Sequence, residues 1–191
     1  MLKCLGHSLG GKIATVLAGR RGDLIDKLII EDVTPKSYQE RNSSRVIPQY
    51  IEAMLNLDLD IRNFKSLSEA KRTADEELKS DVQDTPTRLF LLTNLVEQNG
   101  FYGWKMNLDA IRDNMDSILG FTKEPLDVFN GPTLVISGEK STYVREIDIP
   151  VFHKRFSNVE FKVIKDAGHW VHADQPSDFI EVVVNWLLKQ A

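Results

Sequence analysis

A serine between two glycines is the first residue in this chain with the surroundings of a catalytic nucleophile. Ser8 lies in the pattern Gly6-x-Ser8-x-Gly10, after a short apolar run that predicts a strand and before Lys12–Arg20, which has the spacing of a helix. Such a nucleophile elbow holds a hydroxyl clear of a sheet on a strained turn, and we expect both flanking glycines to be needed for the backbones to pass. A plain glycine turn is the alternative, and the strand and helix on either side favour the nucleophile.

The start of the following helix is expected to stabilise negative charge. Its first backbone N–H groups have no acceptor within the helix, and the N–H of Leu9, the residue after the nucleophile, is the predicted oxyanion donor. A developing oxyanion at this point would also gain from the positive end of the helix dipole.

His169 is the predicted general base for this serine. It lies in Asp166-Ala167-Gly168-His169-Trp170, after the last predicted strand and before the final helix, and the order serine, acid, histidine along the chain is typical of hydrolases with such an elbow. The other histidines have weaker cases. His7 is expected to pack beneath the turn, His172 is either a lining residue of the site or a polar loop residue, and His153 is expected on a helix surface.

Two carboxylates compete for the role of the acid that orients His169. The loop after the strand ending at Gly138 holds Glu139 but no aspartate, whereas Asp32 ends the strand that follows the first helix. An acid at that neighbouring strand tip could hold the same histidine tautomer, so Asp32 is the prediction and Glu139 the alternative. Asp148 and Asp166 are less well placed.

The periodicity around these residues predicts an α/β fold, a parallel sheet with helices on both faces, interrupted by a helical insertion. Residues 1–42 hold strand, turn, helix and strand, residues 43–120 form a helical cap or lid, and residues 121–191 return to the sheet pattern with Pro132–Gly138 and Val159–Ile164 as strands. The charged stretch 66–84 within the insertion predicts one solvated helix. Pocket-lining residues are expected among the following aromatic and histidine side chains: His7, Phe101, Tyr102, Trp104, Trp170 and His172, with Trp104 better explained as lid core.

Composition excludes several other classes of function. The chain has 191 residues, 42% of them hydrophobic, and a net charge of −4, which argues against nucleic acid as a partner. One cysteine, Cys4, allows no internal disulfide. No apolar stretch has the length of a transmembrane segment, and no ligand spacing for a metal or fingerprint for a cofactor is present, so none is predicted. No targeting segment is visible, which predicts a cytoplasmic location for the chain as given.

Several longer segments resemble the alpha/beta-hydrolase domain-containing protein 11 group of the α/β-hydrolase superfamily, which also includes bacterial esterases. The resemblance rests on these segments: Gly6-His7-Ser8-Leu9-Gly10-Gly11-Lys12, Asp32-Val33-Thr34-Pro35, Leu91-Leu92-Thr93-Asn94-Leu95-Val96-Glu97, Trp104-Lys105-Met106-Asn107-Leu108-Asp109-Ala110-Ile111, Gly131-Pro132-Thr133-Leu134 and Ala167-Gly168-His169-Trp170-Val171-His172-Ala173-Asp174. They span the chain from end to end.

This resemblance implies a serine hydrolase that cleaves small-molecule acyl or lipid esters, with diacylglycerol-type lipids among the candidate substrates. It implies a mitochondrial setting for animal members, and it supports Asp32, because the group places its acid after the strand that follows the elbow. The group also has several strands before the elbow and a His-Gly loop that supplies a second oxyanion N–H, and this chain departs from it by starting at the elbow strand. Loss of one such donor typically costs about 3–4 kcal/mol of transition-state stabilisation.

Two further hypotheses therefore stand beside the esterase. One is a catalytically impaired, truncated isoform or partial gene product that acts, if at all, by binding. The other is an acyltransferase with the same three residues, which a water-excluding lid would favour.

Overall fold

The computed structural model describes residues 2–38, 46–60 and 63–189, and it divides the chain into two compact units. The core unit comprises residues 1–37 and 121–191, and the insertion unit comprises residues 38–120. The boundary predicted between residues 42 and 43 lies outside the described residues, and the role of the insertion as a cap stays a prediction.

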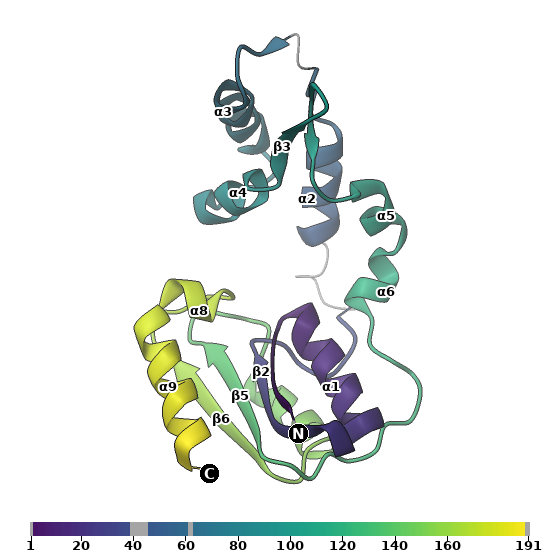
Figure 1. The fold of residues 1–191 in the computed structure, drawn as a ribbon, viewed down its shortest axis with the longest axis vertical. Helices are drawn as coiled ribbons and strands as arrows, with labels where there is room; N and C mark the ends of the chain where they lie inside the picture. The colour runs from purple at the N-terminus through teal and green to yellow at the C-terminus, as the bar shows by residue number, and fades with distance from the viewer. Residues whose placement is uncertain (1, 39–45, 61–62, 190–191) are drawn as a thin grey trace. The chain divides into compact units, whose positions relative to one another are not determined.

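A parallel four-stranded sheet organises the core unit (Figure 1). Its strands, in spatial order, are β1 (Leu2–His7), β2 (Ile25–Glu31), β5 (Thr133–Gly138) and β6 (Val159–Ile164). Neighbouring strands are parallel throughout, so their carboxyl ends share one edge of the sheet. The run Leu28 to Ile30 is buried on both faces, as expected for a strand covered by helices on either side.

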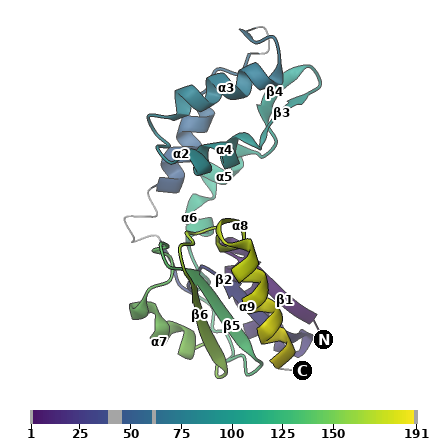
Figure 2. The ribbon, with the colours of Figure 1, turned by 90° about the vertical axis from the view of Figure 1, so that its left-hand side faces the viewer.

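Helices cover both faces of this sheet, which confirms the predicted fold class. Helix α1 (Leu9–Arg21) packs against Ile30, since a Cβ at Gly11 would lie 3.2 Å from the Ile30 Cγ2 atom. Because side chains alternate along a strand, Ile29 points to the other face, where it shares a buried cluster with Trp186 of α9 (Pro176–Lys189). Figure 1 shows the two helices on opposite sides of the sheet, and Figure 2 shows α9 lying over it.

Short helical segments complete the core unit. They are the 3₁₀ helices η1 (Gly22–Leu24) and η4 (Glu146–Asp148) and the helices α7 (Ile149–His153) and α8 (Val171–Asp174). Asp148 is fully buried and forms ion pairs with Lys36 and Arg145, which tie the η4 region to the segment after β2.

The insertion unit has its own apolar core, with Met54, Ala70, Leu78 and Leu95 among its buried members. Its elements are α2 (Val46–Leu55), α3 (Leu67–Leu78), α4 (Thr85–Leu92), β3 (Leu95–Gln98), β4 (Phe101–Trp104), α5 (Leu108–Asp113) and α6 (Met115–Leu119).

Two details of the predicted helical insertion were wrong. First, β3 and β4 form an antiparallel hairpin. Its turn is Asn99-Gly100, both with positive φ (52° and 77°), and Asn-Gly is a strong local hairpin signal that the helical interpretation overlooked. Second, the helix expected over 66–84 ends at Leu78. The Asp84 side chain accepts from the Thr87 N–H and begins a new helix, so the intervening residues form a connection.

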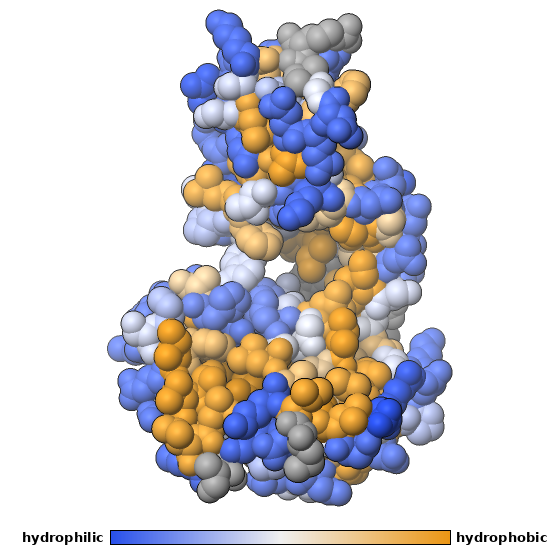
Figure 3. All heavy atoms as spheres, in the orientation of Figure 1, coloured by the Kyte–Doolittle hydropathy of each residue, from blue (hydrophilic) through white to orange (hydrophobic). Residues whose placement is uncertain are grey.

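Within the described ranges, no helix is long and apolar enough to span a membrane. The core unit nevertheless exposes large apolar side chains, seen in orange on its viewer-facing surface in Figure 3. Those of β1 and α9 include Leu2, Leu5, Ile180, Val184 and Leu188. Nothing in the described part of the chain shows what covers these side chains, so by themselves they assign no partner.

Candidate active site

Ser8 occupies a strained turn between β1 and α1. Its φ of 52° is unusual for a residue with a side chain, and its backbone N–H donates to the Glu31 carbonyl of the neighbouring strand (3.0 Å). A Cβ at Gly6 would lie 2.4 Å from the Gly10 carbonyl oxygen, so glycine is needed there.

The expectation that both flanking residues must be glycine was wrong for Gly10. A Cβ at Gly10 would meet no atom within 4 Å, whereas one at Gly11 would lie 2.6 Å from the Val33 Cγ1 atom. The second tight position is therefore where α1 packs against the segment after β2. It is not the residue two places after the serine.

Asp32 lies at the carboxyl end of β2, one strand away from Ser8. It is fully buried, with φ of 48°, and its backbone N–H donates to the Ile136 carbonyl of β5 (2.8 Å). The carboxylate accepts from the Ser141 hydroxyl and, at 3.4 Å, from the Gly138 N–H. These donors replace hydrogen bonds with water that a buried carboxylate gives up.

His169 joins Ser8 to Asp32 through its two ring nitrogens. Nδ1 lies 2.7 Å from Asp32 Oδ2, and Nε2 lies 3.1 Å from Ser8 Oγ. An ionised carboxylate only accepts hydrogen bonds, so Nδ1 carries the proton and the neutral ring leaves Nε2 free to accept from the serine hydroxyl. This tautomer is the one a general base next to a nucleophilic hydroxyl requires.

The rival carboxylates have other partners. Glu139 accepts from the backbone N–H of Asp166 (3.0 Å), Asp166 pairs with Lys140, and Asp148 forms the ion pairs described above. The histidine contact thus falls to Asp32.

Two residues of the loop after β5 reach the site although no pattern indicated them. Ser141 donates to Asp32, and the Tyr143 ring stacks on the His169 ring with centroids 4.0 Å apart. From the sequence, this loop was expected to contribute only an acid. No sequence pattern around a serine or a tyrosine predicts such a contact, because it depends on where the neighbouring strand and the histidine loop lie in the fold.

A second set of polar side chains surrounds the histidine loop. His7 Nε2 lies 2.9 Å from the His169 carbonyl oxygen, and burial lowers the pKa of His7. Glu31 accepts from both the backbone N–H and Nδ1 of His172. Trp170 lies further away, with its ring centroid 6.0 Å from that of His169. Glu31 was not singled out in the sequence, because a glutamate beside Asp32 has no signature of its own.

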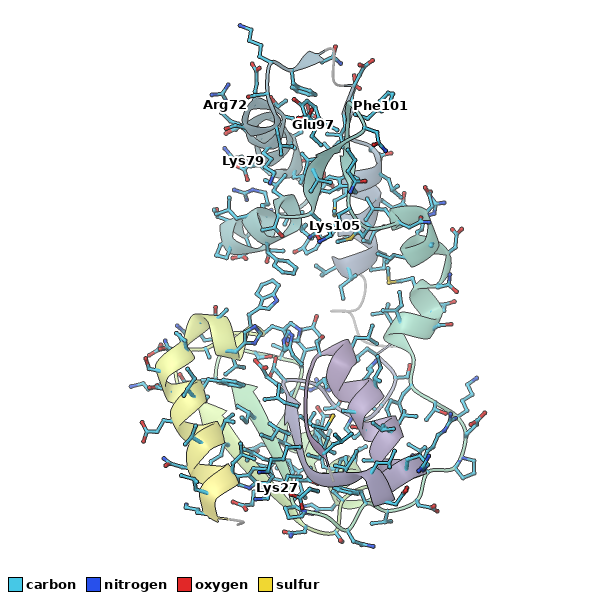
Figure 4. All side chains as sticks on the ribbon, viewed as in Figure 1. Lys27, Arg72, Lys79, Glu97, Phe101 and Lys105 are labelled. Carbon is cyan, nitrogen blue, oxygen red and sulfur yellow. The ribbon has the colours of Figure 1, made fainter. Side chains whose placement is uncertain are left out.

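Three of the aromatic residues predicted to line the pocket, Phe101, Tyr102 and Trp104, belong to the insertion unit. Tyr102 is buried in the core of this unit, and Trp104 packs against that core while its Nε1 donates to the Met54 carbonyl (3.0 Å). Phe101, labelled in Figure 4, is 70% exposed. Their contact with a substrate stays a prediction.

Across the ranges that the structure describes, no three His, Cys, Asp or Glu side chains are arranged to hold a metal ion.

Fold and sequence together define the class of this protein. Residues 2–176 match the family described as alpha/beta hydrolase fold, and the chain belongs to that family. Among curated relatives, it is 37% identical over 187 residues to the sn-1-specific diacylglycerol lipase ABHD11 of Danio rerio, covering 97% of this chain and 57% of the relative. It is 28% identical over 183 residues to the esterase YbfF of Escherichia coli, covering 96% of this chain and 66% of the relative.

A solved structure supports the same assignment. A marine microorganism esterase is 30% identical, with a TM-score of 0.87 over 95% of this chain and 68% of the esterase. The chain spans less than two thirds of the length of the curated relatives named above.

Proposed function

We propose that this protein is a serine hydrolase that cleaves carboxylic esters through Ser8, His169 and Asp32. The observation that carries the proposal is the continuous chain of hydrogen bonds from Ser8 Oγ to His169 Nε2 (3.1 Å) and from His169 Nδ1 to Asp32 Oδ2 (2.7 Å). The three side chains come from separate elements, and their contacts run in the order that a nucleophile, its base and the acid that orients the base require.

The reaction begins with attack of Ser8 Oγ on the ester carbonyl carbon. His169 Nε2 takes the hydroxyl proton as the new C–O bond forms, and then delivers it to the alkoxy oxygen as the alcohol leaves. Water then attacks the acyl-enzyme while the same nitrogen takes its proton. The bond between Ser8 Oγ and the acyl carbon breaks, the carboxylic acid leaves, and the proton returns to Ser8 Oγ. Asp32 keeps His169 in the required tautomer and stabilises the imidazolium that forms in each half-reaction.

The backbone N–H of Leu9 is the proposed donor to the oxyanion. Leu9 is the first residue of α1, where N–H groups lie ahead of the intrahelical hydrogen bonds. The oxyanion would form next to Ser8, so the donor and the helix dipole act where negative charge develops.

The proposed substrates are acyl esters, including diacylglycerol-type lipids. Support comes from the names of the relatives, a diacylglycerol lipase and an esterase. A mitochondrial setting, which the resemblance of the sequence implies for animal members, is proposed as well, and localisation of the expressed protein would test it.

A fluorophosphonate probe tests this function directly, because it reacts much faster with an activated serine than with ordinary hydroxyl groups. The purified chain is expected to be labelled and to hydrolyse p-nitrophenyl butyrate, while Ser8→Ala does neither. The matched control is Ser157→Ala, which removes a hydroxyl from an exposed loop position bonded to Asn130. A folded parent chain that is neither labelled nor active would contradict the proposal and favour a binding role.

A further inference from the structure

Two side chains at the ends of β1 and β2 contact the loop that carries His169, and neither has a role in the reaction above. His7 and Glu31 are register partners in the parallel pairing of β1 with β2. They immediately precede Ser8 and Asp32 in the chain, so each predicted catalytic residue of these strands has a polar neighbour aimed at the histidine loop.

Glu31 holds the far end of this loop. Its side chain is 1% exposed, and Oε1 accepts from the His172 backbone N–H (3.0 Å) and from His172 Nδ1 (2.7 Å). A carboxylate is costly to bury unless its hydrogen bonds replace those with water. The two His172 donors supply such hydrogen bonds, and they tie the start of α8 to the end of β2.

His7 holds the near end of the same loop. A carbonyl oxygen only accepts, so the 2.9 Å contact with the His169 carbonyl requires a proton on His7 Nε2. Burial lowers the pKa of His7 and favours the neutral ring, for which this tautomer fits the contact. Its ring centroid lies 4.7 Å from that of His169 and 5.2 Å from that of His172.

We propose that Glu31 and His7 are positioning residues that fix the backbone of residues 169–172, so that the His169 ring meets Ser8 and Asp32 together. This inference rests on the proposed function and deepens it. The bond to Asp32 restrains one ring nitrogen, but the ring direction also depends on where the His169 backbone lies. The segment between β6 and α8 has no strand partner of its own, and Asp166 within it adopts a φ of 62°. The Ala167 carbonyl and the Gly168 N–H are held by Lys140 and Asp174. Beyond them, His7 anchors the carbonyl of residue 169, and Glu31 anchors the N–H of residue 172, which lies in the first turn of α8 and has no acceptor within that helix.

Pairs of variants distinguish the effect of the Glu31 and His7 hydrogen bonds from the effect of packing alone. Glu31→Ala removes the acceptor, whereas Glu31→Gln keeps an amide oxygen that can receive both His172 donors. His7→Phe keeps a ring without a donor, whereas His7→Gln can place an amide N–H where Nε2 lies. Glu181→Ala, at an exposed position on α9, is the control.

With p-nitrophenyl butyrate, we expect Glu31→Ala to lower kcat about 100-fold with KM little changed, since a displacement near 1 Å has an effect of that order. We expect a smaller fall for His7→Phe, and recovery of most of the lost rate in both glutamine variants. A rise in KM with kcat unchanged, or alanine and glutamine variants that are equally impaired, would overturn the proposal.

Amide hydrogen exchange tests the same anchors without any activity. The His172 amide is expected to exchange faster in Glu31→Ala while the β5 amides keep their protection. Unchanged exchange at His172, or faster exchange throughout the core, would overturn the proposal. An inactive parent chain whose His172 amide still responds to Glu31→Ala would refute the proposed function and leave the anchor in place.

Discussion

Ser8 and Asp32 both adopt positive φ, 52° and 48°, at the carboxyl ends of the neighbouring parallel strands β1 and β2. Such backbone strain costs roughly 1–3 kcal/mol per residue and persists only where the surroundings enforce it. Here the Ser8 N–H donates to the Glu31 carbonyl and the Asp32 N–H to the Ile136 carbonyl. The two side chains consequently leave the same edge of the sheet, where one imidazole bonds to both.

Asp32→Asn is expected to lower kcat by about 10⁴-fold while the protein stays folded. An asparagine can present its amide N–H to His169 Nδ1, which favours the tautomer with the proton on Nε2 and removes the base facing Ser8. Steady-state kinetics and circular dichroism check this prediction. Glu139→Gln is the control for the rival acid, and a larger loss in that variant than in Asp32→Asn would contradict the assignment.

Gly6→Ala and Gly10→Ala are expected to differ sharply although both glycines flank the serine motif. A Cβ at Gly6 would collide with the backbone of Gly10 at 2.4 Å, whereas one at Gly10 meets nothing within 4 Å. Overpacking of this kind typically costs about 1–3 kcal/mol or more, so Gly6→Ala should unfold at lower urea concentration and lose labelling of Ser8. Equal effects of the two substitutions would contradict the steric argument.

The stability of the protein should rise with pH through the titration range of His7. Burial lowers the pKa of His7 below its ordinary value of 6.5. Below 6.5 the unfolded chain therefore binds a proton at this site that the folded chain does not, and stability falls as pH decreases from there towards the folded pKa. Urea unfolding of the parent and His7→Gln at several pH values between about 5 and 8 measures this contribution.

The free energy of unfolding of the parent minus that of His7→Gln should decrease as the pH falls. His153→Gln, at an exposed helix end, is the matched control for loss of an imidazole. A shift no larger than that of His153→Gln would contradict the prediction.

Trp104 should stabilise the insertion unit whatever its part in substrate selection. Its Nε1 donates to the Met54 carbonyl, a bond that links β4 to the end of α2. Trp104→Phe keeps an aromatic ring and should cost about 1 kcal/mol, and Trp104→Ala should cost about 3–5 kcal/mol. Urea unfolding measures these changes in the free energy of unfolding. Circular dichroism is used as the signal because it does not depend on tryptophan fluorescence. Phe101→Ala, at an exposed hairpin position, is expected to leave stability nearly unchanged.

The parts of this fold that depend on local patterns could be predicted from the sequence. The apolar spacing indicated α9, whose Trp186 lies in a buried cluster, and apolar runs indicated β5 and β6, because burial on one helix face or within a sheet leaves a short-range record in the chain. Apolar spacing also indicated α1, but its Ile13 is exposed and its buried face is formed by smaller residues such as Ala14 and Ala18. The β3–β4 hairpin also had a local signal, Asn99-Gly100, which the helical interpretation of the insertion overlooked.

By itself, the sequence determined the fold class, a candidate nucleophile in Ser8, a candidate base in His169, and a choice between Asp32 and Glu139. Only the tertiary structure decided which carboxylate touches the histidine, that Ser141 and Tyr143 reach the site, and that Glu31 holds His172. It also showed that the second position at which a Cβ atom would clash is Gly11 and not Gly10. The reason is that these contacts join residues far apart in the chain. Their distances follow from strand order and register, which no window of neighbouring residues records.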